Sequence, residues 1–327
     1  MLRALRRLGR RDLSEYQHNR AQARGAHATP QGQGPVRPVP VSQGKRKRSG
    51  GVWRVVFIIS LIVFLCAAGA LAFIGYGYWH GQQNNKQLEQ IGFNAPDASE
   101  LQRTDLASFA VDWDALRAIN PDVVGWIYVP GTTVNFPIVH GTDDEHYLKT
   151  DFYGQTSWVS FGSIFLSAAN AADFSDANNI VYGHHMNDGS MFSPFADFGD
   201  ADTFNGHRTV YVFTPAVNYQ LTTFSIVHCA ADDPLAQTAF ASEQERQAYV
   251  QDKVDRSVVT VASLPSAADM EHTFAFSTCD NLASNGRWVL FAYESGSTAA
   301  ASAVADDSSI NPEDVAAVSE AAKETAA

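Results

Sequence analysis

Residues 273–291 read TFAFSTCDNLASNGRWVLF, and this stretch decides the fold. Its first half alternates phenylalanine with small residues, and its second half opens with Arg287 and continues through apolar residues. The turn-prone pair Asn285-Gly286 separates the halves, which predicts two antiparallel strands joined by a loop. Such a hairpin brings Cys279 and Arg287 to the same edge of a sheet.

A cysteine beside an arginine is suited to nucleophilic chemistry. A thiolate next to a fixed cation has a lowered pKa and is more populated near neutral pH. The guanidinium can also stabilise the oxyanion that forms when a carbonyl is attacked. Cys279 is therefore a candidate nucleophile, with Arg287 as its electrostatic partner.

A second chemical signal is the stretch NIVYGHHM at residues 179–186, which predicts a strand ending in a glycine and two histidines. Histidine is the usual partner of a cysteine nucleophile, because it can donate a proton to the leaving amine. His184 and His185 lie about ninety-five residues before Cys279, so the fold must bring the two signals together.

Short apolar runs separated by turn residues continue through the rest of this region, and their density favours a closed barrel or a sandwich. A short amphipathic helix is expected at 111–119, and a second helix at 242–257 before the cysteine strand. The apolar stripe of the second helix is predicted to consist of Ala248, Val250 and Val254. The eight predicted strands are 124–129, 134–139, 162–166, 179–183, 209–213, 219–229, 273–278 and 287–293.

The charge of the chain is divided unevenly between its two ends. The net charge is −12, but residues 1–54 hold 13 Lys and Arg against 2 Asp and Glu. The strongly acidic remainder excludes a uniformly basic nucleic-acid-binding protein. Three cysteines in all exclude a disulfide-rich scaffold and a four-cysteine zinc or iron–sulfur site.

Residues 55–79 contain no charged side chain. A helix of this length reaches about 37 Å, enough to cross the apolar core of a membrane with some tilt. The basic cluster at 45–48 precedes it and aromatic residues end it, which predicts a cytoplasmic N-terminus and an extracellular remainder. A cleaved signal peptide is the alternative, disfavoured because the apolar run exceeds the ~7–15 residues of a signal core.

The chain is thus expected to have five parts. A disordered basic cytoplasmic tail is followed by a single transmembrane helix, an extracellular stalk, a folded catalytic domain and a disordered acidic tail rich in Ala and Ser. The predicted boundaries are 1–54, 55–79, 80–110, 111–295 and 296–327.

These motifs resemble the sortases, the membrane-anchored cysteine transpeptidases of Gram-positive bacteria. Tyr182-Gly183-His184, Ser277-Thr278-Cys279 and the following Arg287 occur in the order typical of that family. The stretches 119–127, 136–139 and 162–166 and the helix before the cysteine strand are similar to class B sortases. The resemblance implies a mainly β fold, an eight-stranded closed barrel with an N-terminal helix.

The resemblance also implies roles for individual residues. Cys279 attacks the Thr carbonyl of a C-terminal sorting signal, often of the Asn-Pro-x-Thr type in class B. His184, by the family's Gly-His position, protonates the leaving amine, and Arg287 holds the substrate backbone or the oxyanion. An amine of a peptidoglycan precursor or a pilin lysine then resolves the thioester. The expected partners are surface proteins or pilins, and neither a metal nor an organic cofactor is needed.

Four further residues are expected near the substrate. The family pattern suggests substrate contacts at Asp144 and Leu148, although Asn is common where Asp144 stands. Ser277 and Asp280, which flank the nucleophile closely, are also candidates for substrate binding.

Several alternatives remain open at the level of sequence. Cys229 and Cys279 could form a disulfide, although Cys229 is better interpreted as a buried apolar residue. His184 and His185 could bind a metal, but adjacent strand residues point to opposite faces. The protein could also be a cysteine protease that only hydrolyses, or a membrane-anchored binding barrel without catalysis.

Overall fold

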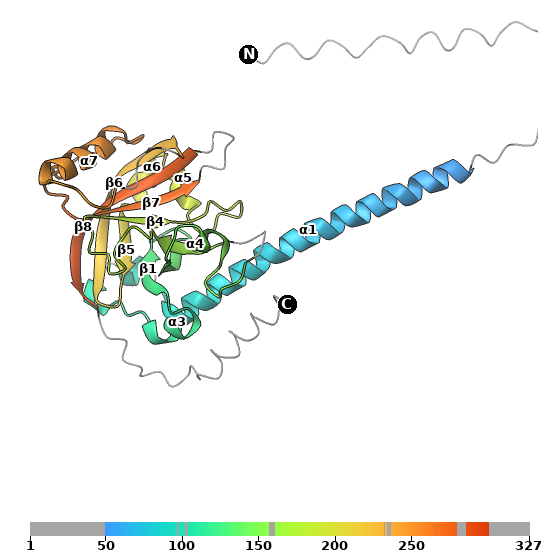
Figure 1. The fold of residues 1–327 in the computed structure, drawn as a ribbon, viewed down its shortest axis with the longest axis horizontal. Helices are drawn as coiled ribbons and strands as arrows, with labels where there is room; N and C mark the ends of the chain where they lie inside the picture. The colour runs from blue at the N-terminus through green and yellow to red at the C-terminus, as the bar shows by residue number, and fades with distance from the viewer. Residues whose placement is uncertain are drawn as a thin grey trace, which may run out of the picture. The chain divides into compact units, whose positions relative to one another are not determined.

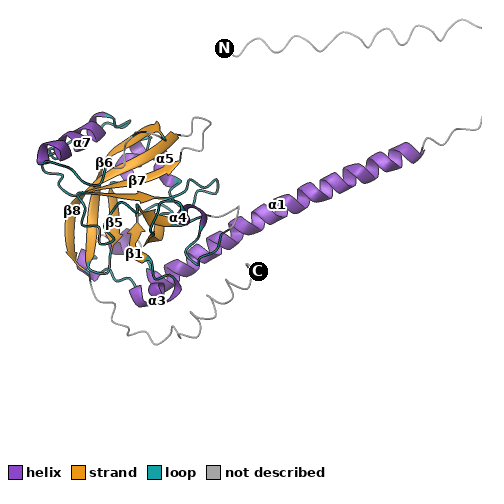
Figure 2. Ribbon diagram, in the orientation of Figure 1, coloured by secondary structure: helices purple, strands orange, loops and turns teal. Residues whose placement is uncertain are grey.

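The computed structural model describes residues 50–96, 98–101, 104–156, 161–231, 233, 237–279 and 286–300, without the side chains of 50, 98, 99 and 279. Eight strands form a closed barrel in the order β1-β2-β3-β4-β7-β8-β6-β5, which confirms the predicted fold class (Figures 1 and 2). The strands are β1 (Val123–Tyr128), β2 (Asn135–His140), β3 (Ile164–Leu166), β4 (Asn178–Tyr182), β5 (Thr209–Phe213), β6 (Val217–Ala230), β7 (Thr273–Cys279) and β8 (Gly286–Ala299).

The structure describes seven α-helices, which are drawn as purple ribbons in Figure 2. The expected helices near 111–119 and 242–257 are both present, as α3 and α7. The full set is α1 (Gly50–Gly92), α2 (Ala98–Leu101), α3 (Trp113–Ile119), α4 (His146–Lys149), α5 (Pro194–Asp197), α6 (Ala201–Gly206) and α7 (Glu243–Asp255), with a 3₁₀ turn at Leu106–Ser108.

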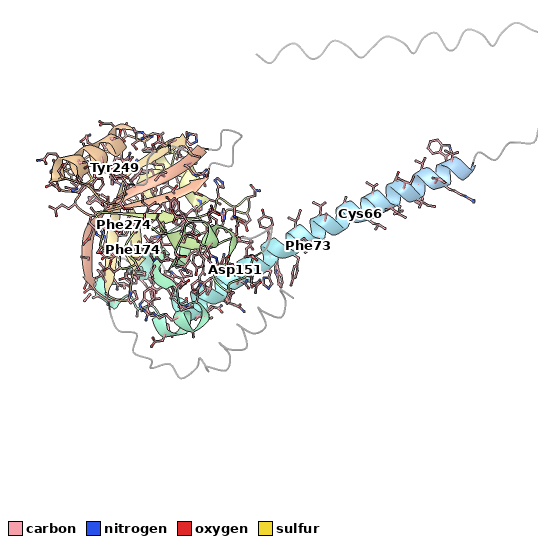
Figure 3. The ribbon with its side chains drawn as sticks, viewed as in Figure 1. Cys66, Phe73, Asp151, Phe174, Tyr249 and Phe274 are labelled. Atoms are coloured by element: carbon pink, nitrogen blue, oxygen red, sulfur yellow. The ribbon has the colours of Figure 1, made fainter. Side chains whose placement is uncertain are left out.

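The interior of the barrel is filled by alternate residues of each strand. Phe274 and Phe276 of β7 point inward, together with Leu290 of β8. Phe274 stacks on Phe174 with ring centroids 6.1 Å apart, and Figure 3 labels both rings. Burying each of these rings contributes about 2 kcal/mol to stability. The alternation of apolar residues that predicted these strands therefore also places their side chains in the core.

Helix α7 covers the outer face of β6 and β8, and only part of its predicted apolar stripe, Val250 and Val254, takes part. Its buried side chains are Arg246, Tyr249, Val250 and Lys253. The predicted stripe was wrong at Ala248, which is exposed. The alkyl stem of an arginine or lysine can cover apolar surface while its charged group keeps polar partners. Arg246 and Lys253 therefore complete the buried face of α7.

The buried heads of these cations have such partners. The guanidinium of Arg246 donates to the carboxylate of Glu243 and to the carbonyl oxygens of Met270 and Ala268. The ammonium of Lys253 lies 4.5 Å from the ring centroid of Tyr249. Helix α7 is thereby fixed to the segment that leads into β7.

Residues 80–110 do not form the separate stalk that was expected. Leu88, Phe93 and Phe109 are at most 5% exposed. They pack with Trp126 of β1 and with α3 in one apolar cluster on the outer face of the barrel. The folded domain therefore begins within the second half of α1 and not at residue 111.

The other expected boundary, at residue 295, is also wrong. Strand β8 runs to Ala299, which pairs with Val217 of β6. Because the long β6–β8 ladder supplies partners for the backbone, the strand continues through small polar residues that lack a strand-like pattern. Of the expected tails 1–54 and 296–327, residues 50–54 belong to α1 and residues 296–299 to β8, whereas 1–49 and 301–327 lie outside the described residues.

Helix α1 is long and apolar enough to cross a membrane. Its most apolar 18-residue window has a mean hydropathy of 2.9, and none of that window is buried within the protein. Val55, Phe57 and Phe64 are more than half exposed. A helix that is apolar on all sides and unburied in protein is typical of a membrane span.

Candidate active site

Strand register brings the two chemical motifs together. Strands β4 and β7 are parallel, and Tyr182 pairs with Ser277. The backbone N–H of Gly183 donates to the carbonyl oxygen of Ser277 at 3.1 Å, just beyond the last pair. Continuing this register by two residues sets position 184 beside position 279. Residues ninety-five apart in sequence therefore become neighbours across two strands.

The second pairing of β7 adds the arginine. Strands β7 and β8 are antiparallel, and Cys279 pairs directly with Arg287. Positions 184, 279 and 287 thus form one row across three adjacent strands, at the ends of β4 and β7. We refer to these three positions, which are the predicted catalytic residues, as the catalytic row. The side chain of Cys279 and the whole of Asp280 lie outside the described residues.

The catalytic row lies on the outer face of the barrel. Ile180 of β4, Ala275 of β7 and Val289 of β8 pack outward under α7. Positions 184, 279 and 287 each lie an even number of residues from Ile180, Ala275 and Val289, respectively. Because alternate residues of a strand share a face, the three positions continue this face beyond the part that α7 covers. The site is therefore a surface of the sheet and not the barrel interior.

The imidazole of His184 is held by a backbone carbonyl. Its Nε2 lies 2.6 Å from the carbonyl oxygen of Leu148, at the end of α4. Because a carbonyl only accepts, Nε2 carries the hydrogen and donates it. Nδ1 is then the nitrogen left to exchange a proton with a substrate.

Gly162 closes one side of this histidine. Its φ of +55° is a conformation that favours glycine. A Cβ at this position would lie 2.7 Å from the carbonyl oxygen of Tyr147, 2.9 Å from that of Leu148 and 2.9 Å from Cδ2 of His184. The absence of a side chain thus allows α4, the 161–163 segment and the histidine to meet.

Tyr182 lies two residues before His184 on the same face of β4. Burial raises the pKa of its phenol and the nearby carboxylate of Asp144 raises it further, whereas Ser167 and the guanidinium of Arg287 lower it. The phenol therefore stays protonated at neutral pH and can donate a hydrogen bond. Arg287 itself is half-buried, and its Nη1 donates to the carbonyl oxygen of Gly286 at 3.1 Å.

The expected substrate contacts occupy different environments. Asp144 accepts from the Ala168 N–H at 2.7 Å and from the Ser167 hydroxyl at 3.0 Å, so both of its oxygens bind the loop after β3. The side chain of Leu148 is 39% exposed, and that of Ser277 is buried. Leu148 is thus free to contact a ligand, whereas Asp144 is engaged within the protein.

His185 lies outside the catalytic row. It forms an isolated antiparallel bridge with Met191, and its parity is opposite to that of His184. The two histidines therefore do not share a face, which agrees with the choice of His184 over His185.

Cys229 occupies the far side of Arg287. It pairs with Arg287 in the β6–β8 ladder, while Cys279 pairs with Arg287 from β7. Two strand spacings separate the cysteines by roughly 10 Å, beyond the ~7 Å limit for a disulfide. Cys229 is a free thiol whose pKa burial raises to about 11, with a further contribution from Asp233. Cys229 is half-buried, so the expectation of a fully buried residue was wrong; its thiol is protonated at neutral pH, and the alternative of a Cys229–Cys279 disulfide was also wrong.

Three contributors to this site were missed at the level of sequence: the Leu148 carbonyl, Gly162 and Tyr182. A backbone carbonyl has no side-chain signature, so the first could not have been found. Gly162 could have been suspected, because a glycine immediately before a strand often marks a special backbone conformation. Tyr182 could have been found by applying strand alternation backwards from His184.

Known proteins of similar sequence are sortases. No protein-family model matches the chain. The sortase B of Listeria monocytogenes is 28% identical over 222 residues, which span 66% of this chain and 87% of that protein. The sortase B of Staphylococcus aureus is 29% identical over 169 residues, which span 52% of this chain and 68% of that protein.

Solved structures of similar fold are also sortases. Clostridium perfringens sortase B has a TM-score of 0.52 at 28% identity, covering 55% of this chain and 98% of that one. A Bacillus anthracis protein described as similar to sortase B has a TM-score of 0.56 at 28% identity, covering 68% and 98%. The closed eight-stranded barrel and the likeness to sortase B in both sequence and structure support a class B sortase, an enzyme of the sortase type.

Proposed function

We propose that the chain is a membrane-anchored transpeptidase in which Cys279 is the nucleophile, His184 the general acid and Arg287 the oxyanion or backbone-binding group. The observation that supports this assignment is the strand register: the β4–β7 ladder ends at Tyr182 and Ser277, two residues before His184 and Cys279, and Cys279 pairs with Arg287. A nucleophile, a proton donor and a fixed cation on one face are the requirements of acyl transfer through a thioester.

In the first half of the proposed reaction, the thiolate of Cys279 attacks the carbonyl carbon of the substrate threonine. The developing oxyanion is stabilised by the guanidinium of Arg287. The peptide C–N bond then breaks, and the leaving amine takes a proton from Nδ1 of His184. The products are a thioester on Cys279 and a released C-terminal fragment.

In the second half, an acceptor amine attacks the thioester carbonyl and loses a proton to Nδ1 of His184, and the thiolate of Cys279 leaves. Surface proteins or pilins with a C-terminal sorting signal are the proposed acyl donors. The amine of a peptidoglycan precursor or of a pilin lysine is the proposed acceptor. The chemistry is complete with these side chains and two substrates.

We further propose that α1 anchors the enzyme, with residues 55–79 in the membrane. The basic residues at 45–48 and Arg54 precede the apolar segment, and cytoplasmic flanks carry an excess of such residues. The catalytic domain then lies outside the cell, where surface proteins and cell-wall precursors are found.

Product analysis tests this function. The full chain in detergent is incubated with a peptide carrying an Asn-Pro-x-Thr motif, with and without triglycine as the amine acceptor, and the products are identified by mass spectrometry. We expect cleavage after the threonine and a threonine–triglycine conjugate, both absent in Cys279→Ala. Hydrolysis alone at saturating triglycine would instead indicate a cysteine protease. No labelling of Cys279 by a panel of sorting-signal vinyl sulfones would indicate a binding barrel.

A further inference from the structure

A cavity lies between α1 and the barrel, outside the catalytic row. Its volume is about 300 Å³, within the range of small-ligand sites. One wall is the face of α1 from Phe73 to Leu88, and the opposite wall comes from segments 151–156 and 161–164. Figure 3 labels Phe73 and Asp151, which line the cavity from its two sides.

The cavity contains a carboxylate, Asp151, with one oxygen that no described residue donates to. Oδ1 of Asp151 accepts from the backbone N–H groups of Tyr153 at 3.0 Å and Gln155 at 2.8 Å. Oδ2 accepts no hydrogen bond from a described residue. Burial raises the pKa of this carboxyl group, and His80 across the cavity partly opposes the rise. No lysine or arginine is present among the described residues that line the cavity.

A second polar group without a partner among the described residues belongs to Tyr153, which also lines the cavity. Tyr153 is 9% exposed, and its buried hydroxyl makes no hydrogen bond to any part of the chain that the structure describes. A buried hydroxyl without a partner is costly, as is a half-satisfied carboxylate. A ligand that donates hydrogen bonds and carries positive charge would satisfy the second oxygen of Asp151.

The remaining walls are aromatic. Phe73, Tyr76, Phe136 and Phe161 line the cavity, and Tyr78 packs edge-on against Phe161 at 5.5 Å. Aromatic faces attract cations and cover alkyl chains. Phe73 and Tyr76 also lie in the outer part of the proposed membrane span, so the cavity lies where that span meets the folded domain.

We propose that this cavity is a binding site for an alkylammonium group, with the ammonium at Asp151 and the alkyl body against the aromatic wall. This site is additional to the transpeptidase chemistry and does not depend on Cys279. The ammonium has two possible sources with the same chemistry, an amine-bearing lipid headgroup or a soluble amine.

The first experiment measures recognition of charge. Binding of hexylamine and of its neutral counterpart hexanol to the full chain in detergent is measured by calorimetry. We expect hexylamine to bind at least about tenfold more tightly than hexanol, because only the ammonium makes a charge-assisted contact with Asp151. Equal affinities for the two probes would overturn the proposal without any mutation.

The variants assign the effect to the carboxylate. Asp151→Asn keeps an acceptor oxygen for the turn and should reduce hexylamine affinity by about tenfold or more while leaving hexanol unchanged. Glu271→Gln removes an exposed carboxylate outside the cavity and should change neither. Tyr76→Ala should weaken both probes. Unchanged hexylamine binding in Asp151→Asn would contradict the site.

A lipid arm separates the two sources. The chain is placed in nanodiscs with or without phosphatidylethanolamine, and hexylamine binding is measured again. Weaker hexylamine binding in the presence of the lipid, lost in Asp151→Asn, identifies the headgroup as the natural occupant. Unchanged binding identifies a soluble amine. Activity toward sorting-signal peptides is measured separately, so failure of this site and failure of the transpeptidase proposal are distinguishable.

Discussion

Nε2 of His184 lies 2.6 Å from the carbonyl oxygen of Leu148, which is 36 residues earlier in the chain. The contact joins the end of β4 to the end of the short helix α4 and fixes which ring nitrogen bears the hydrogen. The orientation of the proposed general acid is therefore set by backbone, through a helix that the sequence did not predict.

The two histidines should differ sharply in catalysis. His184→Ala removes the proton donor and should lower the transpeptidation rate by at least about 100-fold, whereas His185→Ala should retain most activity because it faces away. Steady-state rates with one sorting-signal peptide check this, with folding verified by circular dichroism. An inactive His185→Ala together with an active His184→Ala would show that the register is displaced by one residue.

Gly162→Ala should reduce activity about 100-fold, because its Cβ would push apart the Leu148 carbonyl and the His184 ring. Gly154→Ala is a matched control. Gly154 has φ +78°, but a Cβ there would meet nothing within 4 Å. The Gly154→Ala variant should lose about 1 kcal/mol of stability because of its backbone conformation alone, and it should keep its activity. Rates and thermal unfolding of the two variants are compared, and equal losses of activity would contradict the contact with His184.

The parts of this site that could be predicted from the sequence are those carried by side-chain pattern. Alternation and turn residues predicted all eight strands. The spacing of Cys279 from Arg287 predicted that these two residues lie side by side, and they pair in the β7–β8 ladder. The Leu148 carbonyl and the docking of Leu88 could not be predicted, because they depend on tertiary contacts between distant segments. The buried face of α7 was predicted correctly at Val250 but without its two cations, because Arg246 and Lys253 look solvent-exposed when only periodicity is considered.

Cys229 should titrate as a half-buried thiol with a raised pKa. Because its pKa is raised to about 11, the native state favours the protonated thiol, and its contribution to stability is lost as the pH rises from about 9.0 toward 11. Alkylation by iodoacetamide in a Cys66→Ser/Cys279→Ala background should accelerate about tenfold per pH unit up to that value. The same protein in urea should level off near pH 9. A native profile that also levels off near pH 9 would contradict the burial.

Protease added outside intact spheroplasts should digest the domain beyond residue 80 and leave the N-terminal tail protected. This expectation follows from the basic cluster before the apolar segment of α1. Antibodies against epitopes at the two ends follow the fragments, and detergent-permeabilised cells serve as the control for tail cleavage. A protected catalytic domain would reverse the orientation and exclude a cell-surface role.

Arg287 should be sensitive even to a conservative change, because lysine cannot reproduce its two-pronged guanidinium. Its two neighbours in the sheet differ in chemistry, which provides a control. It pairs with Cys279 on one side and with the protonated Cys229 on the other. Arg287→Lys keeps the positive charge but loses the two-pronged guanidinium, so the rate should fall by about 100-fold or more while the fold is kept. Cys229→Ala changes the other neighbour and should leave kcat close to that of the parent protein. Thioester formation, followed by mass spectrometry of the intact enzyme, separates loss of the first chemical step from loss of substrate binding. If Arg287→Lys forms the thioester at the parental rate, the guanidinium has no part in the attack, and its role is reduced to holding the substrate backbone.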